Sequence, residues 1–293
     1  MNLLLFLVTA SLPAAEAEVH EKANPLYRQL RRQGIALAGN QNLRLPAPAM
    51  PDGLEGTVQQ ATIKKLLGDD IDIDNFLRDA VTAPQLLRRP DEKKGGPATP
   101  VRSLDLYFIA YGTLDSLADK AVLEGMAASE RRPVQPRVLT PEELKLRGIA
   151  IPREASKYED FAYVQANILV RVQVRGVGHS FWSRSPDSLV AATELDERFA
   201  KDPQFPNQWR SLIKEGEDDV KEGPAHPYCG AAYYVKITRL KEPAGALFVE
   251  AHVVFTEPVK WFDGENVLRS KLPAATMSLV RNFRRELARI QKK

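Results

Sequence analysis

Cysteine is nearly absent from the sequence, which has one residue of this type, Cys229, among 293. An intramolecular disulfide is therefore excluded, and the fold has to be stabilised by a hydrophobic core. Histidine is also scarce, with four residues. His226 and Cys229 have a spacing suited to two metal ligands, but no second pair follows at a suitable distance. We therefore expect no metal site, and interpret this pair as a partly exposed His and a buried Cys.

A strong charge of one sign is lacking too. The chain has 41 Lys and Arg against 38 Asp and Glu, a net charge of +3, which is too small to indicate a nucleic-acid partner. No apolar run approaches the roughly 20 residues that a transmembrane helix needs. Neither a P-loop nor a G-x-G-x-x-G motif is present, so nucleotide binding has no support and we expect no cofactor.

The first residues have the pattern of a secretory signal peptide. An apolar run covers 3–8, and small residues lead to Ala15-Glu16-Ala17, an A-x-A cleavage site. We predict a signal peptide over 1–17 and an exported mature protein, periplasmic or extracellular, that begins at Glu18. The alternative interpretation is a buried N-terminal helix.

Glycine and proline divide the rest of the chain into segments. They recur every few residues over 18–55, which predicts a poorly structured leader. Residues 56–293 are predicted to form a single domain, with loop or linker segments near 89–100 and 129–160. The sequence does not define an oligomeric state.

Several helices are predicted within this domain. Apolar residues recur at helical spacing over 57–67 and 72–87, and Asp72 or Asp74 is suited to cap the second helix. Thr140 and Glu143 form a capping box around Pro141. The last helix, predicted over 273–292, has an apolar stripe and a basic outer face. That face is either solvated, which we favour, or a contact for a membrane surface or an acidic polymer. The stripe consists of Met277, Val280, Phe283, Leu287 and Ile290.

Strands are indicated by alternation of apolar and polar residues. This pattern covers 101–111, 164–174 and 188–195, and a hairpin is predicted from 231–237 and 247–255 with a loop at 241–245. The fold class predicted is α+β: a curved antiparallel sheet packed on a long C-terminal helix, with additional N-terminal helices. Val170, Val172 and Val253 are expected to pack against the stripe of the last helix.

The order of strands and terminal helix resembles the helix-grip architecture of START-like domains. Four stretches also resemble an uncharacterised family of exported bacterial proteins, a resemblance that implies export and no particular activity. The stretches are 105–112 (DLYFIAYG), 185–190 (SPDSLV), 205–210 (FPNQWR) and 266–273 (NVLRSKLP).

Catalytic chemistry has little support from the sequence. No G-x-S-x-G elbow is present, and His179 and Ser180, as neighbours on a strand, would point to opposite faces. We therefore assign no catalytic residue. A secreted hydrolase whose catalytic residues are dispersed along the chain is kept as the alternative function.

Aromatic residues near predicted strand ends are the candidate ligand-binding residues. Trp261 and Phe262 lie between the last strand and the last helix, and Trp182 follows a break at Gly176 and Gly178. Such rings either seal a core or line the opening of a ligand cavity. We predict that Trp261, Phe262 and Trp182 contact an apolar or amphipathic ligand, and that the protein is a non-catalytic exported binding or interaction module.

Overall fold

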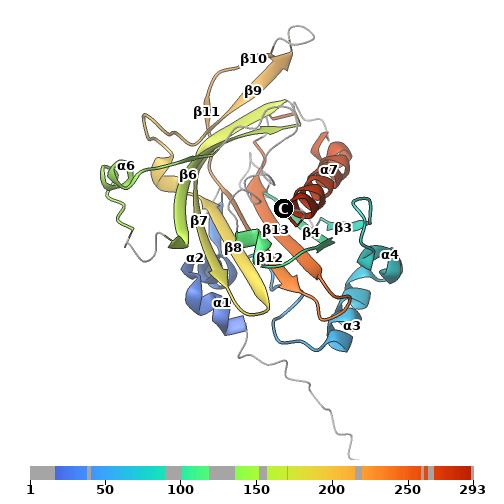
Figure 1. The fold of residues 1–293 in the computed structure, drawn as a ribbon. Coiled ribbons are helices and arrows are strands. Elements are labelled where there is room, and N and C mark those ends of the chain that lie inside the picture. Colours follow the sequence, from blue (N-terminus) through green and yellow to red (C-terminus); the bar gives the residue numbers. More distant parts are fainter. Residues whose placement is uncertain are drawn as a thin grey trace, which may run out of the picture.

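The computed structural model describes residues 17–37, 41–89, 101–118, 136–151, 157–169, 171–214, 220–258, 261–262 and 267–291. Eleven strands of this part form one antiparallel sheet, in the order β10-β9-β7-β8-β12-β13-β4-β3 (Figure 1). β11 pairs with β9, and β6 lies between β5 and β7. The strands are β3 Gln85–Arg88, β4 Val101–Tyr111, β5 Arg137–Val138, β6 Glu159–Ile168, β7 Val172–Arg184, β8 Ser188–Leu195, β9 Gln208–Lys214, β10 Val220–Glu222, β11 His226–Pro227, β12 Ala231–Arg239 and β13 Ala246–Thr256.

Helices cover both faces of the sheet, which confirms the α+β class with a terminal helix. α7 (Val267–Ile290) contacts β3 and β4 on one face, here called the helix face. The N-terminal elements pack on the opposite face, here called the N-terminal face. The shorter elements are α1 Ala17–Ala23, α2 Pro25–Arg28, η1 Gln29–Gln33, α3 Gly56–Leu67, α4 Ile73–Leu77, η2 Ser116–Ala118, α6 Pro141–Lys145, η4 Glu197–Phe199, and a separate hairpin of β1 Ile35–Leu37 and β2 Gln41–Leu43.

The last helix buries the centre of its predicted stripe. Val280, Phe283 and Leu287 are fully buried, and Phe283 meets Phe108 of β4 edge to face at 5.5 Å between ring centroids. The predicted partners were wrong for Val172, which belongs to a different cluster around Trp209. Val170 lies outside the described residues. The buried partners come from β4, β8, β12 and β13, because α7 crosses the sheet over β3 and β4.

One arginine of the outer face is buried. Arg284 is 7% exposed and donates from Nε to the Ile109 carbonyl at 2.7 Å and from Nη1 to the Ala83 carbonyl at 2.6 Å. Burial, together with the charge of Arg281, lowers the pKa of Arg284 to about 10. Arg285 and Arg289 are exposed. The predicted solvated basic face therefore holds for these two arginines and not for Arg284.

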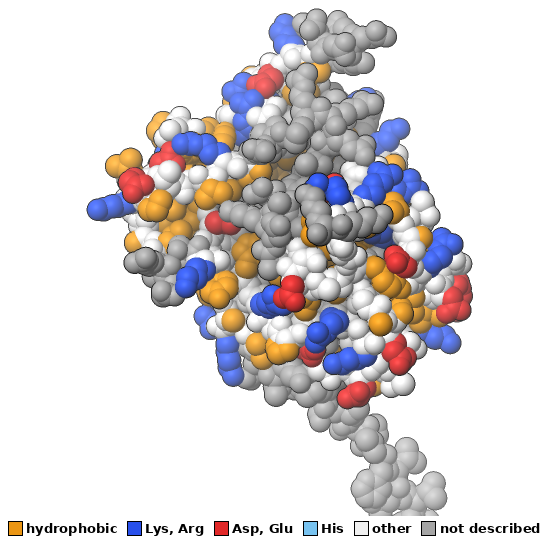
Figure 2. Space-filling view, in the orientation of Figure 1, with side chains coloured by type: hydrophobic (Ala, Val, Ile, Leu, Met, Phe, Trp, Pro, Cys, Tyr) orange, Lys and Arg blue, Asp and Glu red, His pale blue; other side chains and the backbone are white. Residues whose placement is uncertain are grey.

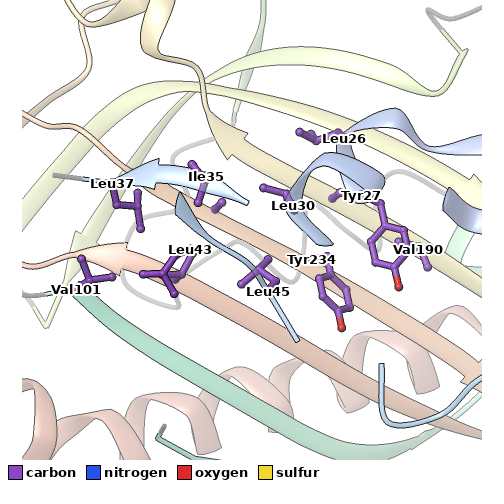
Figure 3. Packing of buried hydrophobic residues seen from close by; sticks show 13 residues of the cluster. Leu26, Tyr27, Leu30, Ile35, Leu37, Leu43, Leu45, Val101, Val190 and Tyr234 are labelled. Atoms are coloured by element: carbon purple, nitrogen blue, oxygen red, sulfur yellow. The ribbon is translucent and has the colours of Figure 1, made fainter. Parts of the chain in front are cut away.

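Residues 18–55 were predicted to be poorly structured, and this was wrong for most of the range. Asn24 caps α2 and Pro25 occupies its first turn, while Gly34, with φ 82°, ends η1. Glycine and proline therefore mark the ends of short elements here. Figure 3 shows the apolar side chains of this segment lying against the strands of the N-terminal face. They are Leu26, Tyr27, Leu30, Ile35, Leu37, Leu43 and Leu45, packed on Val101, Val190 and Tyr234.

The predicted helix over 72–87 is also wrong in its length. Asp72 caps α4 as expected, but the helix ends at Leu77, where Arg78 is extended. Residues 85–88 pair with β4 instead, from Gln85 opposite Phe108 to Arg88 opposite Asp105. Pairing with the edge of the sheet overrides the helical spacing of the apolar residues.

A single strand over 164–174 was predicted, and the structure has a hairpin there. β6 ends at Ile168, Leu169 adopts the left-handed region with φ 51°, and β7 begins at Val172. The turn has no glycine or proline, so its alternating residues give no signal of a break. The strands at 101–111 and 188–195, the hairpin of β12 and β13, and the capping box of Thr140 and Glu143 are confirmed. The segment predicted as a loop near 89–100 falls outside the described residues from 90 onward.

Candidate functional site

A cavity of about 880 Å³ lies where β6 begins and β7 ends. Two walls enclose it. One comes from β5, α6 and the residues after α6, and the other comes from η2, the end of β7 and the start of β8. Figure 2 shows hydrophobic side chains grouped over α6 at the left of this view.

The lining of the cavity divides into an apolar interior and a more polar exposed part. The exposed lining includes Lys145, Lys157, Tyr158 and Arg184. Lining of this kind fits a molecule with a long apolar part and a polar end. The buried apolar lining consists of Leu117, Leu139, Leu144, Ile149, Phe161 and Leu189.

A histidine backs the cavity wall. His179 stacks on Phe161 with ring centroids 4.3 Å apart, and its Nε2 lies 2.8 Å from Glu159 Oε1. Burial alone would lower the pKa of His179, but hydrogen bonds with Glu194 and Glu159 outweigh it and raise that pKa. His179 thus lies between two carboxylates that favour its protonated form, with its ring stacked beside Phe161.

The three predicted ligand-binding residues are not brought together. Trp182 lines the cavity and packs in the cluster of α7, beside Val235. Trp261 and Phe262 are 3% and 2% exposed and belong to a separate aromatic cluster with Trp209 and Tyr228. The Tyr228 and Trp261 rings stack with centroids 5.4 Å apart. Proximity to a strand end locates these rings along the chain but does not determine whether they seal the core.

A row of polar side chains crosses the helix face beside the cavity, and sequence reasoning did not identify it. The strand registers place Asp160 opposite Ser180, Ser180 opposite Thr193, and Thr193 opposite Tyr233. Ser180 Oγ and Thr193 Oγ1 are 3.0 Å apart. Alternation within each strand indicates which of its residues share a face. It does not indicate which residues of the four strands lie opposite one another.

A buried serine, histidine and aspartate set lies on the N-terminal face. His20 Nδ1 is 2.8 Å from Ser183 Oγ and His20 Nε2 is 2.7 Å from Ser188 Oγ, which donates to Asp52 Oδ1 at 2.7 Å. Lys236 Nζ contacts Asp52 Oδ1 at 2.6 Å. Each of these five residues is at most 7% exposed. The set therefore ties the N-terminal segment to β7, β8 and β12 through groups that have almost no contact with solvent.

A second buried polar set lies on the same face, under residues 49 and 50. Glu250 is fully buried and accepts from the backbone N–H of Ala49 at 2.6 Å and of Met50 at 3.3 Å. His252 lies between Asp105, at 2.7 Å, and Glu250, at 3.3 Å. Burial opposes the charge on His252, but the hydrogen bonds with Asp105 and Glu250 outweigh it and raise its pKa.

The structure corrects the reading of the candidate metal ligands. Cys229 is exposed, not buried, and the His226 ring stacks on Trp209 at 4.6 Å. Within the described ranges, no group of three or more His, Cys, Asp or Glu residues is placed to hold a metal ion. The same part of the chain contains no helix that is both long and apolar enough to cross a membrane.

The fold and the site together define an α+β domain whose sheet is covered on both faces and has an apolar cavity at one end. No family model and no curated protein sequence matches the chain. Its similar solved structures include the human StarD13 (DLC2) lipid transfer and protein localization domain, with 8% identity and a TM-score of 0.40 over 80% of this chain and 98% of that chain. Human STARD10 has 9% identity and a TM-score of 0.34 over 78% and 87% of the two chains. An uncharacterized protein from Rhizobium leguminosarum has 11% identity and a TM-score of 0.35 over 65% and 98%.

Proposed function

We propose that this protein is an exported, non-catalytic module that binds an apolar or amphipathic small molecule in the cavity between α6 and Trp182. The observation that carries the proposal is the lining: a buried apolar interior next to exposed polar side chains. Its volume of about 880 Å³ lies within the range typical of ligand pockets, roughly 300–1,000 Å³.

The division of the lining orients the ligand. Its apolar part lies against Leu144, Phe161 and Leu189, where water is displaced from apolar surface on both sides. Its polar end lies toward the exposed part of the lining, near Lys157 and Arg184. Trp182 contacts the apolar part and is the tryptophan that reports on binding.

Titration with N-phenyl-1-naphthylamine, a neutral dye that fluoresces in apolar surroundings, tests this assignment. We expect saturable binding by the native protein and its loss in Ala150→Trp, because Ala150 lines the cavity and a large ring there fills it. Ala288→Trp, on the exposed side of α7, is the matched control and should bind like the native protein. The assignment fails if the dye does not bind, or if both variants bind it equally.

A further inference from the structure

We propose that His20 of α1 is a positioning residue for the ligand cavity, and that it acts through Ser183 on the ends of β7 and β8. Ligand binding and docking of the N-terminal segment, residues 17–54, therefore strengthen each other. The inference rests on the proposed function, because the wall that His20 holds is the wall that contains Trp182.

The ends of β7 and β8 form a hairpin whose two faces have different partners. One face lines the cavity with Trp182, Arg184 and Leu189. Alternate residues of a strand point to opposite sides, and on the other side Phe181 and Val190 pack with apolar side chains of the N-terminal segment. A displacement of the hairpin by the N-terminal segment therefore also moves the cavity wall.

His20 fixes this hairpin through both of its ring nitrogens. Nδ1 lies 2.8 Å from Ser183 Oγ of β7, and Nε2 lies 2.7 Å from Ser188 Oγ of β8. Ser188 donates its only hydroxyl proton to Asp52 Oδ1, so its oxygen accepts from the His20 Nε2–H. Both serines are at most 4% exposed, and a buried hydroxyl that loses its partner costs free energy. Because Ser183 also lines the cavity, the link from α1 to the wall is direct.

The end of β7 depends on this contact because few strand pairs support it. β6 pairs with β7 only as far as Phe181, and the Trp182 N–H then donates to one carbonyl that precedes β6. Within the described residues, Ser183 and Arg184 have a strand partner on the β8 side alone. Asn24 adds a second contact from the N-terminal segment, since its Nδ2 donates to the Phe181 carbonyl at 2.8 Å. Weakly paired ends of this kind open most readily when a neighbour is removed.

The coupling has to act in both directions. If docking of the N-terminal segment raises the affinity for the ligand, the ligand stabilises docking by the same factor. Neither His20 nor Asn24 is among the residues that line the cavity. Their substitution therefore changes ligand affinity through the hairpin and not by removing a contact with the ligand.

Titration of two variants with N-phenyl-1-naphthylamine tests the inference. His20→Gln should weaken dye binding by about 5-fold or more, the lower limit of typical coupling between two sites. Asn24→Asp keeps an oxygen to cap α2 but loses the donor to β7, so it should also weaken binding, by a smaller factor. Leu43→Ala is the matched control. Leu43 packs in the same cluster beside Val101, away from the hairpin (Figure 3), so this variant should lower the melting temperature and leave dye affinity unchanged.

Protection from trypsin measures the reverse direction of the coupling. Arg28 and Arg32 are exposed cleavage sites within the N-terminal segment. Saturating dye should slow cleavage after these residues in the native protein. It should have no effect in Ala150→Trp, in which a ring fills the cavity.

The outcomes separate the two proposals. The inference is overturned, and the cavity assignment stands, if His20→Gln binds the dye like the native protein or if Leu43→Ala weakens binding as much. Cleavage that saturating dye does not slow leads to the same conclusion. Should His20→Gln fail to fold, the affinity of Asn24→Asp decides. If the native protein does not bind the dye, the proposed function fails, and the inference fails with it.

Discussion

The native structure favours the protonated form of His252. Both ring nitrogens face carboxylates, Nδ1 toward Asp105 and Nε2 toward Glu250, and the Tyr234 and Tyr107 rings enclose it. Because its pKa is raised in the folded state, the stabilisation is complete below the unfolded pKa, near 6.5, and is lost as the pH rises through the folded pKa.

The free energy of unfolding should therefore fall as the pH rises from 6 toward 9, measured by urea titration at each pH. His252→Gln should have lower stability at pH 6 and a weaker decline above it. His179 also has a raised pKa and contributes a decline of the same sign, so His179→Gln measures its share. An unchanged slope in His252→Gln would show that this residue does not carry the pH dependence.

The positions of individual aromatic and polar residues could be predicted from the sequence only in part. That Trp182 lies near a strand end could be predicted, but the expected break at Gly176 and Gly178 was wrong, because β7 runs through both glycines from Val172 to Arg184. The burial of Trp261 could not be predicted, because it depends on Trp209 and Tyr228, which come from distant parts of the chain. Asp160 and Tyr233 likewise become neighbours of one row only through the pairing of four strands.

Among the elements, the N-terminal segment depends on buried ionic contacts as well as on apolar ones. Lys236 Nζ contacts Asp52 at 2.6 Å and donates to the Met50 carbonyl at 2.7 Å. Burial opposes the charge on Asp52, yet its hydrogen bond with His20 and the charge of Lys236 hold the pKa of Asp52 well below its usual value. A single substitution at Lys236 thus leaves a buried carboxylate without its cation.

Lys236→Met should lower the free energy of unfolding by roughly 3–5 kcal/mol, as expected when one partner of a buried pair is removed. Limited proteolysis should then cut within residues 17–54, because that segment is no longer held on the sheet. Lys241→Met, at an exposed lysine near Asp187, serves as the control and should change stability by less than about 0.5 kcal/mol. A loss below about 1 kcal/mol for Lys236→Met would mean that apolar packing alone holds the segment.

Elements were predictable from the sequence where local pattern and tertiary role agree. β4 and the hairpin of β12 and β13 alternate regularly, and their alternating faces pack on α7 and on the N-terminal elements. The N-terminal segment was not predictable in this way, since its helices have four to seven residues and show no periodicity of their own. Its order comes from Val190, Tyr234 and other side chains of the sheet.

For the whole molecule, the proposed export is compatible with the position of α1. Cleavage after Ala17 leaves His20, Asn24 and Leu26 in the mature chain, and these are the residues that contact β7 or pack on the N-terminal face. Expression of the full sequence in a bacterial host should yield a periplasmic or secreted protein whose first residue is Glu18. N-terminal sequencing that finds Met1 on protein in the cytoplasm would contradict this expectation.

Several buried contacts join residues that are far apart in the sequence, and this affects when the chain can fold as it is synthesised. The Ala49 N–H donates to Glu250, and Arg284 donates to the Ala83 carbonyl. In each pair the second residue follows the first by 201 residues. Neither side of the sheet can close before the final strands and helix have been translated, because a chain of this high contact order gains its stabilising pairs last. The apolar residues of the N-terminal segment therefore find their partners on β8, β12 and β13 only after most of the chain has been made.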